Sequence, residues 1–235
     1  MQPADLAAVA GEQALVLAID TATPASSAGL ARGGDVLGSF GHVDPMKHGE
    51  VLAPGIAAVL ADAGVDRREL TAVAVGVGPG PFTGLRVGLA TAIVLASTLR
   101  IPLLGVCSLD VISLGLAADA FVGGEALVVS DARRKEVFWA RYRAPGVRVT
   151  DAAVDRPQVL ATDEPAAGAG ARLYPEAFSR PVDPQWPDAG LLAAAVATGS
   201  LPDAAVLPAR PLYLRRPDAT VGGGRKPVLP AGARP

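Results

Sequence analysis

The chain has 235 residues, of which 50% are hydrophobic, and a formal net charge of −2. This length can form one large domain or two smaller lobes with buried cores. The overall charge argues against a broadly basic nucleic-acid binder. The 4% aromatic content favours close packing of helices on sheets over an aromatic surface that stacks bases.

The sequence carries no sign of export or membrane insertion. Its single cysteine, Cys107, lies in an apolar stretch, so we expect a buried thiol and a reducing, cytoplasmic location. The N-terminus contains Asp5 and Glu12 and no basic region, which argues against a signal peptide. We find no run that approaches eighteen apolar residues, and we therefore expect no membrane span.

Basic residues gather at the C-terminal end of the chain. From residue 208 onward, six basic residues and one acidic residue give a net charge of +5, which leaves −7 for the rest. A solvated tail explains this pattern, and direct contact of residues 210–226 with nucleic acid is the alternative. Glycine and proline residues beyond Arg216 predict disorder there.

Apolar runs in the first half predict three strands before any long helix, preceded by a loose extension at residues 1–13. The strands are expected at residues 14–19, 27–31 and 36–41. From His48 to about Gly64, apolar residues recur at three- and four-residue spacing, which predicts an amphipathic helix.

A glycine-rich turn joins a predicted strand at 72–77 to a predicted helix at 85–98. Its sequence is Gly78-Pro79-Gly80-Pro81-Phe82-Thr83-Gly84-Leu85-Arg86-Val87-Gly88. Thr83 can cap the helix, and the first helix amides would then face an anion or a partner's side chain. The alternative is a tight connection with only a structural role. The spacing fits neither a Walker A loop nor G-x-G-x-x-G, which disfavours both nucleotide-binding interpretations.

The second half loosely repeats this order and indicates a second lobe of related topology. A helix capped within residues 108–110 is expected to run to about Ala118, and a short one to cover 190–198. Strands are expected from residue 102 to 106, at 126–129 and at 137–142. We divide the chain into an extension (1–13), an N-terminal lobe (14–107), a C-terminal lobe (108–216) and a disordered tail (217–235).

Asp20 ends the first buried strand, with Thr21 and Thr23 beside it. In an actin-like or sugar-kinase-like lobe, residues at this place hold Mg²⁺ and phosphates, whereas a turn that closes the strand is the simpler explanation. We favour the turn because no glycine-rich phosphate turn follows the second lobe's strand. Asp20 and Thr21 then form at most a vestigial nucleotide site.

The remaining reactive side chains predict neither a metal site nor a catalytic residue. His42 and His48 are the two histidines, and no third nitrogen or sulfur ligand lies at zinc spacing. His48 is better explained as the start of a helix. Cys107 has no neighbour that would activate it as a nucleophile.

Five sequence blocks together resemble one family, the tRNA threonylcarbamoyladenosine biosynthesis protein TsaB, also called YeaZ. The blocks are LAIDTAT at 17–23, HGE at 48–50, the glycine-rich turn at 78–88, SDARRKEV at 130–137 and PLYLR at 211–215. They occur in family order over nearly the whole chain, and the third is the most specific. Pro81 departs from the family pattern, in which many members have serine. Because proline lacks an amide donor, it weakens phosphate binding by the turn.

The resemblance implies an α/β fold of the actin/Hsp70/sugar-kinase (ASKHA) type, with two ribonuclease-H-like lobes. It also implies a non-catalytic subunit that binds and stabilises or activates the related subunit TsaD. With the ATPase TsaE, that complex attaches threonylcarbamoyl to N6 of adenosine 37 in tRNA. ATP and Mg²⁺ would be used by the partner subunits, so we expect no cofactor in this chain. A homodimer in the absence of TsaD stays open.

In that family the two long helices of the first lobe pair with their TsaD counterparts. The resemblance assigns this contact here to Leu52, Ile56, Leu60, Leu89 and Ile93. The residues of the family-motif loop are Gly78, Pro79, Gly80, Phe82, Thr83, Gly84 and Arg86. Two other functions stay open, namely a stand-alone actin-like ATPase that uses Asp20 and a metallopeptidase.

Overall fold

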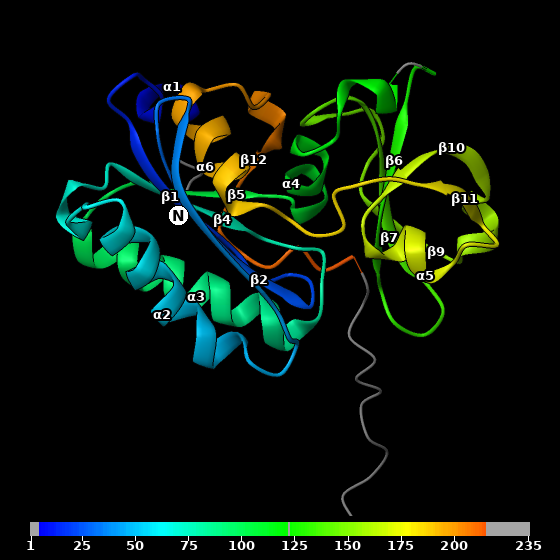
Figure 1. The fold of residues 1–235 in the computed structure, drawn as a ribbon, viewed down its shortest axis with the longest axis horizontal. Coiled ribbons are helices and arrows are strands. Elements are labelled where there is room, and N and C mark those ends of the chain that lie inside the picture. The colour runs from blue at the N-terminus through cyan, green and yellow to red at the C-terminus, as the bar shows by residue number, and fades with distance from the viewer. Residues whose placement is uncertain (1–4, 122, 215–235) are drawn as a thin grey trace, which may run out of the picture.

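The computed structural model describes residues 5–121 and 123–214, which form two α/β lobes next to each other (Figure 1). The strands of the first lobe are β1 (Leu15–Asp20), β2 (Ala25–Arg32), β3 (Asp35–Val43), β4 (Ala72–Gly76), β5 (Leu103–Val106) and β12 (Val206–Leu207). They form one sheet in the order β12-β5-β4-β1-β2-β3. The first three strands form the antiparallel meander that the sequence predicts, and β4 and β5 then extend the sheet in parallel with β1.

The second lobe has a sheet of its own. Its strands are β6 (Ala126–Asp131), β7 (Val137–Ala144), β8 (Val147–Arg148), β9 (Ala153–Asp155), β10 (Thr162–Ala167) and β11 (Phe178–Pro181). The order is β11-β10-β6-β7-β8, and β9 also pairs with β7. Two sheets with helices packed on them confirm the α/β architecture with two lobes.

Six α-helices cover the sheets in the described part of the chain. They are α1 (Leu6–Val9), α2 (His48–Asp62), α3 (Phe82–Leu99), α4 (Ser108–Leu114), α5 (Ala169–Leu173) and α6 (Ala189–Thr198). Short 3₁₀ turns lie at Arg67–Glu69, Ala118–Phe121, Pro157–Leu160 and Asp203–Ala205.

Helices cover both faces of the first sheet, which explains why β1 is apolar throughout. Leu17 and Ile19 point into a core shared with α2 and α3, whereas Val16 and Ala18 point into a core shared with α6. Figure 1 shows α2 and α3 together on one side of this sheet and α6 on the other. A strand buried on both faces reads as a continuous hydrophobic run.

The chain returns to the first lobe after the second sheet. Helix α6 and strand β12 lie within the predicted second lobe (108–216), but α6 packs on β2 and β12 pairs with β5. A Cβ on Gly29 of β2 would lie 2.2 Å from the backbone nitrogen of Gly190, so the helix approaches the sheet through two glycines. Contacts over such sequence distances leave no local pattern in the sequence.

Some local predictions are corrected. Residues 6–9 of the supposed loose extension form α1, because Leu6 and Val9 lie one helical turn apart and are both buried in the first lobe. Helix α4 ends at Leu114 rather than near Ala118, and a separate 3₁₀ turn follows it. The tail predicted to be disordered, residues 217–235, lies outside the described residues.

Helix α3 is more apolar than the sequence analysis anticipated. It has 18 residues and a mean hydropathy of 1.6, so by length and composition alone it could cross a membrane. In the structure it packs on the first sheet through Leu89, Ala92 and Ala96, which are all buried. A core helix of a folded lobe passes the same test, so α3 is weak evidence for a membrane span.

Candidate functional site

Three of the five family blocks meet where β1 ends. Thr21 donates a hydrogen bond from its hydroxyl to the carbonyl of Gly84 at 2.8 Å and accepts one from the amide of Gly88 at 3.0 Å. His48, the first residue of α2, also lies next to Gly84, since a Cβ there would be 3.3 Å from its Nε2. Residues far apart in the sequence therefore form one packed junction around Asp20 and Thr21.

Both oxygens of the Asp20 carboxylate accept hydrogen bonds from within the protein. One oxygen accepts a hydrogen bond from the amide of Ala22 at 2.8 Å, and the other accepts one from the hydroxyl of Ser108 at 2.6 Å. The residue is only 1% exposed. Burial raises the pKa of Asp20 from 3.8 to about 6, and the two hydrogen bonds oppose that shift. In this conformation Asp20 is buried, and each of its oxygens accepts a hydrogen bond from within the protein.

The glycines of the family-motif loop allow it to pack directly on this turn. A Cβ on Gly80 would lie 1.9 Å from the carbonyl oxygen of Ala22, and one on Gly84 would lie 2.6 Å from that of Thr21. The tight, structural connection that we left open in the sequence therefore describes the loop better than an anion cradle.

The predicted helix caps at this junction are wrong. Helix α3 begins at Phe82, its N-cap position is Pro81, and no side chain caps it, so Thr83 lies within the first turn. Likewise Ser108 is the first residue of α4 rather than its cap, and its hydroxyl is used by Asp20 and by the amide of Gly78. Nothing in the local sequence pairs Ser108 with Asp20, because 88 positions separate them.

The two remaining candidate groups, His48 and Cys107, are structural. His48 starts α2 as predicted, is buried, and its Nδ1 lies 2.7 Å from the hydroxyl of Ser26. Burial lowers its pKa, so the neutral ring is favoured. Cys107 is completely buried, and burial raises the pKa of its thiol to about 12. Within residues 5–121 and 123–214, no group of three or more histidine, cysteine, aspartate or glutamate side chains could hold a metal ion.

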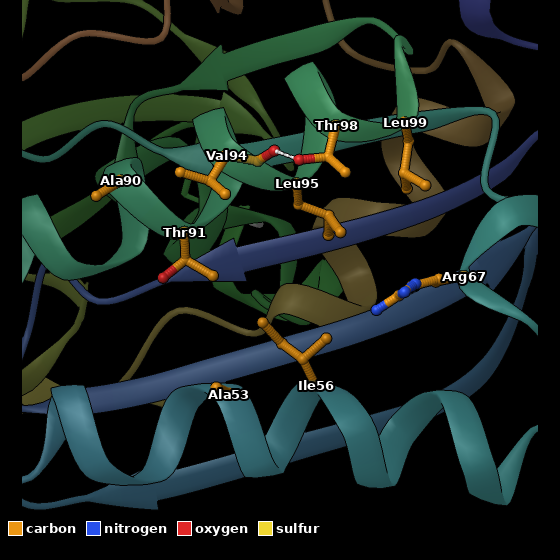
Figure 2. Close-up of a pocket in the computed structure, with 9 residues that line it drawn as sticks. All are labelled: Ala53, Ile56, Arg67, Ala90, Thr91, Val94, Leu95, Thr98 and Leu99. Carbon is orange, nitrogen blue, oxygen red and sulfur yellow. Dashed lines mark hydrogen bonds between the residues drawn. The ribbon is translucent and has the colours of Figure 1, made fainter.

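A groove of about 560 Å³ runs between α2 and α3 on the outer side of the first lobe (Figure 2). Arg67 lies at one end, and the other side chains that line the groove are aliphatic or threonine. They are Ala53, Ile56, Ala90, Thr91, Val94, Leu95, Thr98 and Leu99. Figure 2 shows that Ala53 and Ile56 come from α2, whereas Val94 and Leu95 come from α3 opposite. We call this surface the α2–α3 groove.

The predicted partner contacts are only partly on this surface. Leu52 and Leu89 are 1% and 4% exposed and point into the core, so they are corrected to core residues. Ile56 is also largely buried but lines the groove, and Leu60 is half-buried. Ile93 is exposed. The exposed face of these helices therefore differs from the predicted one. Helical spacing shows that a helix has an apolar side, but it does not show which of the apolar residues meet the sheet.

Comparison with known proteins agrees with these observations. The family model TsaD, described as tRNA N6-adenosine threonylcarbamoyltransferase, matches residues 41–207. A protein of Mycobacterium tuberculosis is 47% identical over 207 residues, which are 87% of this chain and 93% of that relative. The tRNA threonylcarbamoyladenosine biosynthesis protein TsaB of Escherichia coli is 37% identical over 128 residues, 54% of each chain. The solved structure of YeaZ from Pseudomonas aeruginosa superposes with a TM-score of 0.70 at 29% identity, over 86% of this chain and 100% of that one.

The two sheets define a two-lobed α/β protein, as the sequence predicts, and its fold is that of YeaZ. The chain belongs to the tRNA N6-adenosine threonylcarbamoyltransferase family and, within it, to the TsaB/YeaZ proteins of threonylcarbamoyladenosine biosynthesis. The predicted family is thereby confirmed.

Proposed function

We propose that this chain is the non-catalytic subunit of the complex that makes N6-threonylcarbamoyladenosine in tRNA, and that it binds and stabilises or activates TsaD. The family model that matches most of the chain is that of the transferase itself. Two related subunits that share a fold can pair through corresponding helices, much as two copies of one chain pair in a symmetric dimer. The modification of tRNA by this complex is consistent with a cytoplasmic location.

Helix α3 is the observation that carries this proposal. It is 18 residues long and strongly apolar, yet only 33% of it is buried in this chain. Val94, which lines the α2–α3 groove, is 65% exposed. Its neighbour Ile93 on the same helix is 40% exposed. Contiguous exposed apolar surface is unfavourable for an isolated protein and typical of an interface. A TsaD helix pair of similar fold would bury it.

A non-catalytic role is supported by the junction at Asp20. Its carboxylate is buried and hydrogen-bonded by Ser108 and Ala22, and the loop that follows β4 fills the adjacent space. The proposal therefore leaves ATP and Mg²⁺ to the partner subunits, including a TsaE-like ATPase. The stand-alone ATPase and metallopeptidase hypotheses receive no support from the described side chains.

Reconstitution tests the proposal. Threonylcarbamoyl transfer to tRNA should be measured with the purified partners, TsaD and TsaE among them, with and without this chain. We expect product formation to depend on its presence. Undiminished transfer in its absence would reject the proposal, and so would rapid hydrolysis of ATP or peptides by the isolated chain.

A pair of variants tests the surface. Val94→Asp places a charge among the side chains that line the α2–α3 groove and should weaken TsaD binding at least tenfold, as expected for a central apolar contact. Leu173→Asp is the matched control, because Leu173 is 53% exposed on α5 in the second lobe. Sedimentation analysis with TsaD gives the affinity of each variant for that partner. The same analysis of the chain alone shows whether this face supports a homodimer. Equal binding by both variants would exclude this face.

A further inference from the structure

A pocket of about 440 Å³ lies where α4, the β7–β8 hairpin and the 3₁₀ turn at Asp203–Ala205 meet. Its lining combines charged and aliphatic side chains. The charged ones are Asp110, Arg143, Arg148 and Asp151, and the aliphatic ones include Val147, Val149 and Ala204. We call this space the α4–β8 pocket. Its size suits a small molecule, and it shares no residue with the α2–α3 groove.

Asp110 has one carboxylate oxygen that no protein group satisfies. Its Oδ1 accepts a hydrogen bond from the hydroxyl of Tyr142 at 2.6 Å, whereas no donor in the described part of the chain reaches its buried Oδ2. The residue is 0% exposed. Burial raises the pKa of Asp110, and Arg148 and the Tyr142 hydroxyl oppose that shift. A buried polar atom without a partner is unfavourable, and beside a pocket it points to a ligand that donates a hydrogen bond.

Arg148 is only loosely paired with Asp110. Its Nη1 lies 3.6 Å from Oδ1 of Asp110, which makes an ion pair but is too long for a hydrogen bond. Its side chain is 21% exposed and lines the same pocket, and Arg143 is exposed beside it. The planar guanidinium group of arginine matches a carboxylate with two parallel hydrogen bonds. The pocket therefore combines an acceptor for a cationic group with donors for an anionic one.

We propose that the α4–β8 pocket binds a free α-amino acid with a short aliphatic side chain, whose ammonium bonds to Oδ2 of Asp110 and whose carboxylate is bound by Arg148 and Arg143. Because Oδ2 is closed to solvent, Arg148 moves aside on binding. The ligand ammonium then replaces Arg148 as the counter-charge of Asp110, and the guanidinium turns to the ligand carboxylate. Val147, Val149 and Ala204 supply apolar contacts for the side chain.

Other small ligands match the charges of this pocket less well. The carboxylate of Asp110 would repel a simple anion, and the two arginines would repel a metal ion. Two arginines and two aspartates line the pocket, so their charges cancel, and a zwitterion can pair with both signs. The inference goes beyond the proposed function, because it requires neither TsaD nor the α2–α3 groove.

Calorimetric titration of the full chain with L-valine tests the inference, and L-alanine and L-leucine extend the test to a smaller and a larger side chain. We expect saturable binding of L-valine at millimolar concentration or below. Isobutylamine and 3-methylbutanoate keep the side chain but lack the carboxylate and the ammonium, respectively. Each should bind at least roughly tenfold more weakly, because one charged group of the pocket then stays unpaired.

Two variants test the pocket without touching the core. Arg143→Gln removes a donor to the carboxylate and Ala204→Phe fills the space, and both residues are exposed. Each should weaken binding of L-valine by roughly tenfold. Asp110→Asn, which removes the acceptor for the ammonium, should abolish it. Arg180→Gln is the matched control, because Arg180 is an exposed arginine of β11 outside the pocket, and it should bind normally. Thermal unfolding confirms that each variant is folded.

Three results would overturn the inference. The first is that none of the three amino acids binds, and the second is that isobutylamine or 3-methylbutanoate binds as tightly as L-valine. The third is that Arg143→Gln and Ala204→Phe bind L-valine as tightly as Arg180→Gln does. TsaD binding is tested separately at Val94, so each of these results leaves the proposed function intact.

Discussion

Ser108 donates a hydrogen bond from its hydroxyl to Oδ2 of Asp20 across 2.6 Å, although the two residues are 88 positions apart. Asp20 ends the central strand of the first lobe, and Ser108 begins the helix that leads into the second. The bond is buried and therefore less exposed to competition from water than a surface contact. It joins the helix that leads into the second lobe to a fully buried strand of the first.

The wild-type protein should lose stability as the pH rises and Asp20 ionises, and Asp20→Asn should abolish this loss. The pKa of Asp20 is about 6 in the folded protein and 3.8 for an ordinary aspartate. Between these values the carboxyl ionises first in the unfolded chain. The contribution of the neutral Asp20 side chain to stability is therefore fully present below pH 3.8 and is lost as the pH rises through 6. The loss is on the order of 2–3 kcal/mol. Urea unfolding between pH 4 and 7 should show that the free energy of unfolding of the variant rises by this amount relative to that of the wild type.

A surface carboxylate provides the control for this pH series. Asp62→Asn removes a charge at the exposed end of α2 and accounts for general effects of net charge. If Asp20→Asn and Asp62→Asn change the pH profile equally, the raised pKa of Asp20 is refuted.

Gly80→Ala should destabilise the junction, whereas Gly49→Ala should stabilise the protein. A Cβ at residue 80 meets the carbonyl oxygen of Ala22 at 1.9 Å, and backbone cannot rotate away as a side chain can. We expect a loss of about 1–3 kcal/mol or more. Gly49 lies in α2 with nothing within 4 Å of its Cβ position, so alanine there should gain roughly 0.5–1 kcal/mol. Chemical denaturation measures both, and similar effects at the two sites would contradict the close packing of the loop.

Leu52→Ala and Val94→Ala should separate core from surface on the two long helices. Leu52 is buried under α2, so its truncation should cost about 2–5 kcal/mol of unfolding free energy. Val94 is 65% exposed, and its truncation should change the stability of the isolated chain by less than about 0.5 kcal/mol. Denaturation of each variant alone gives these values. A small effect at Leu52 would mean that this face of α2 is turned outward.

Cys107 should resist alkylation until the protein unfolds. Its side chain is fully buried and the pKa of its thiol is about 12, so both access and thiolate formation are suppressed. Mass spectrometry after treatment with iodoacetamide at pH 8 should show little modification in buffer and complete modification in denaturant. Rapid alkylation of the native chain would show that the region around α4 opens readily.

Much of the fold was visible in the sequence because its signals are local. The uninterrupted apolar run at β1, the recurring apolar residues of α2 and the glycine-rich turn before α3 each report on neighbouring residues. Short elements with little hydrophobic pattern, such as α5 and the strands β8 to β12, were not predicted, since their pairing depends on distant partners.

By itself, the sequence determined the family, the two lobes and the places where strands, turns and long helices occur. Only the tertiary structure decided which side of α2 and α3 faces the sheet, that Ser108 satisfies Asp20, and that Tyr213 reaches Phe82. The physical reason is the distance along the chain over which each effect acts. Periodicity and turn chemistry act over a few residues, whereas burial and hydrogen bonding are settled between segments that meet only when the chain has folded.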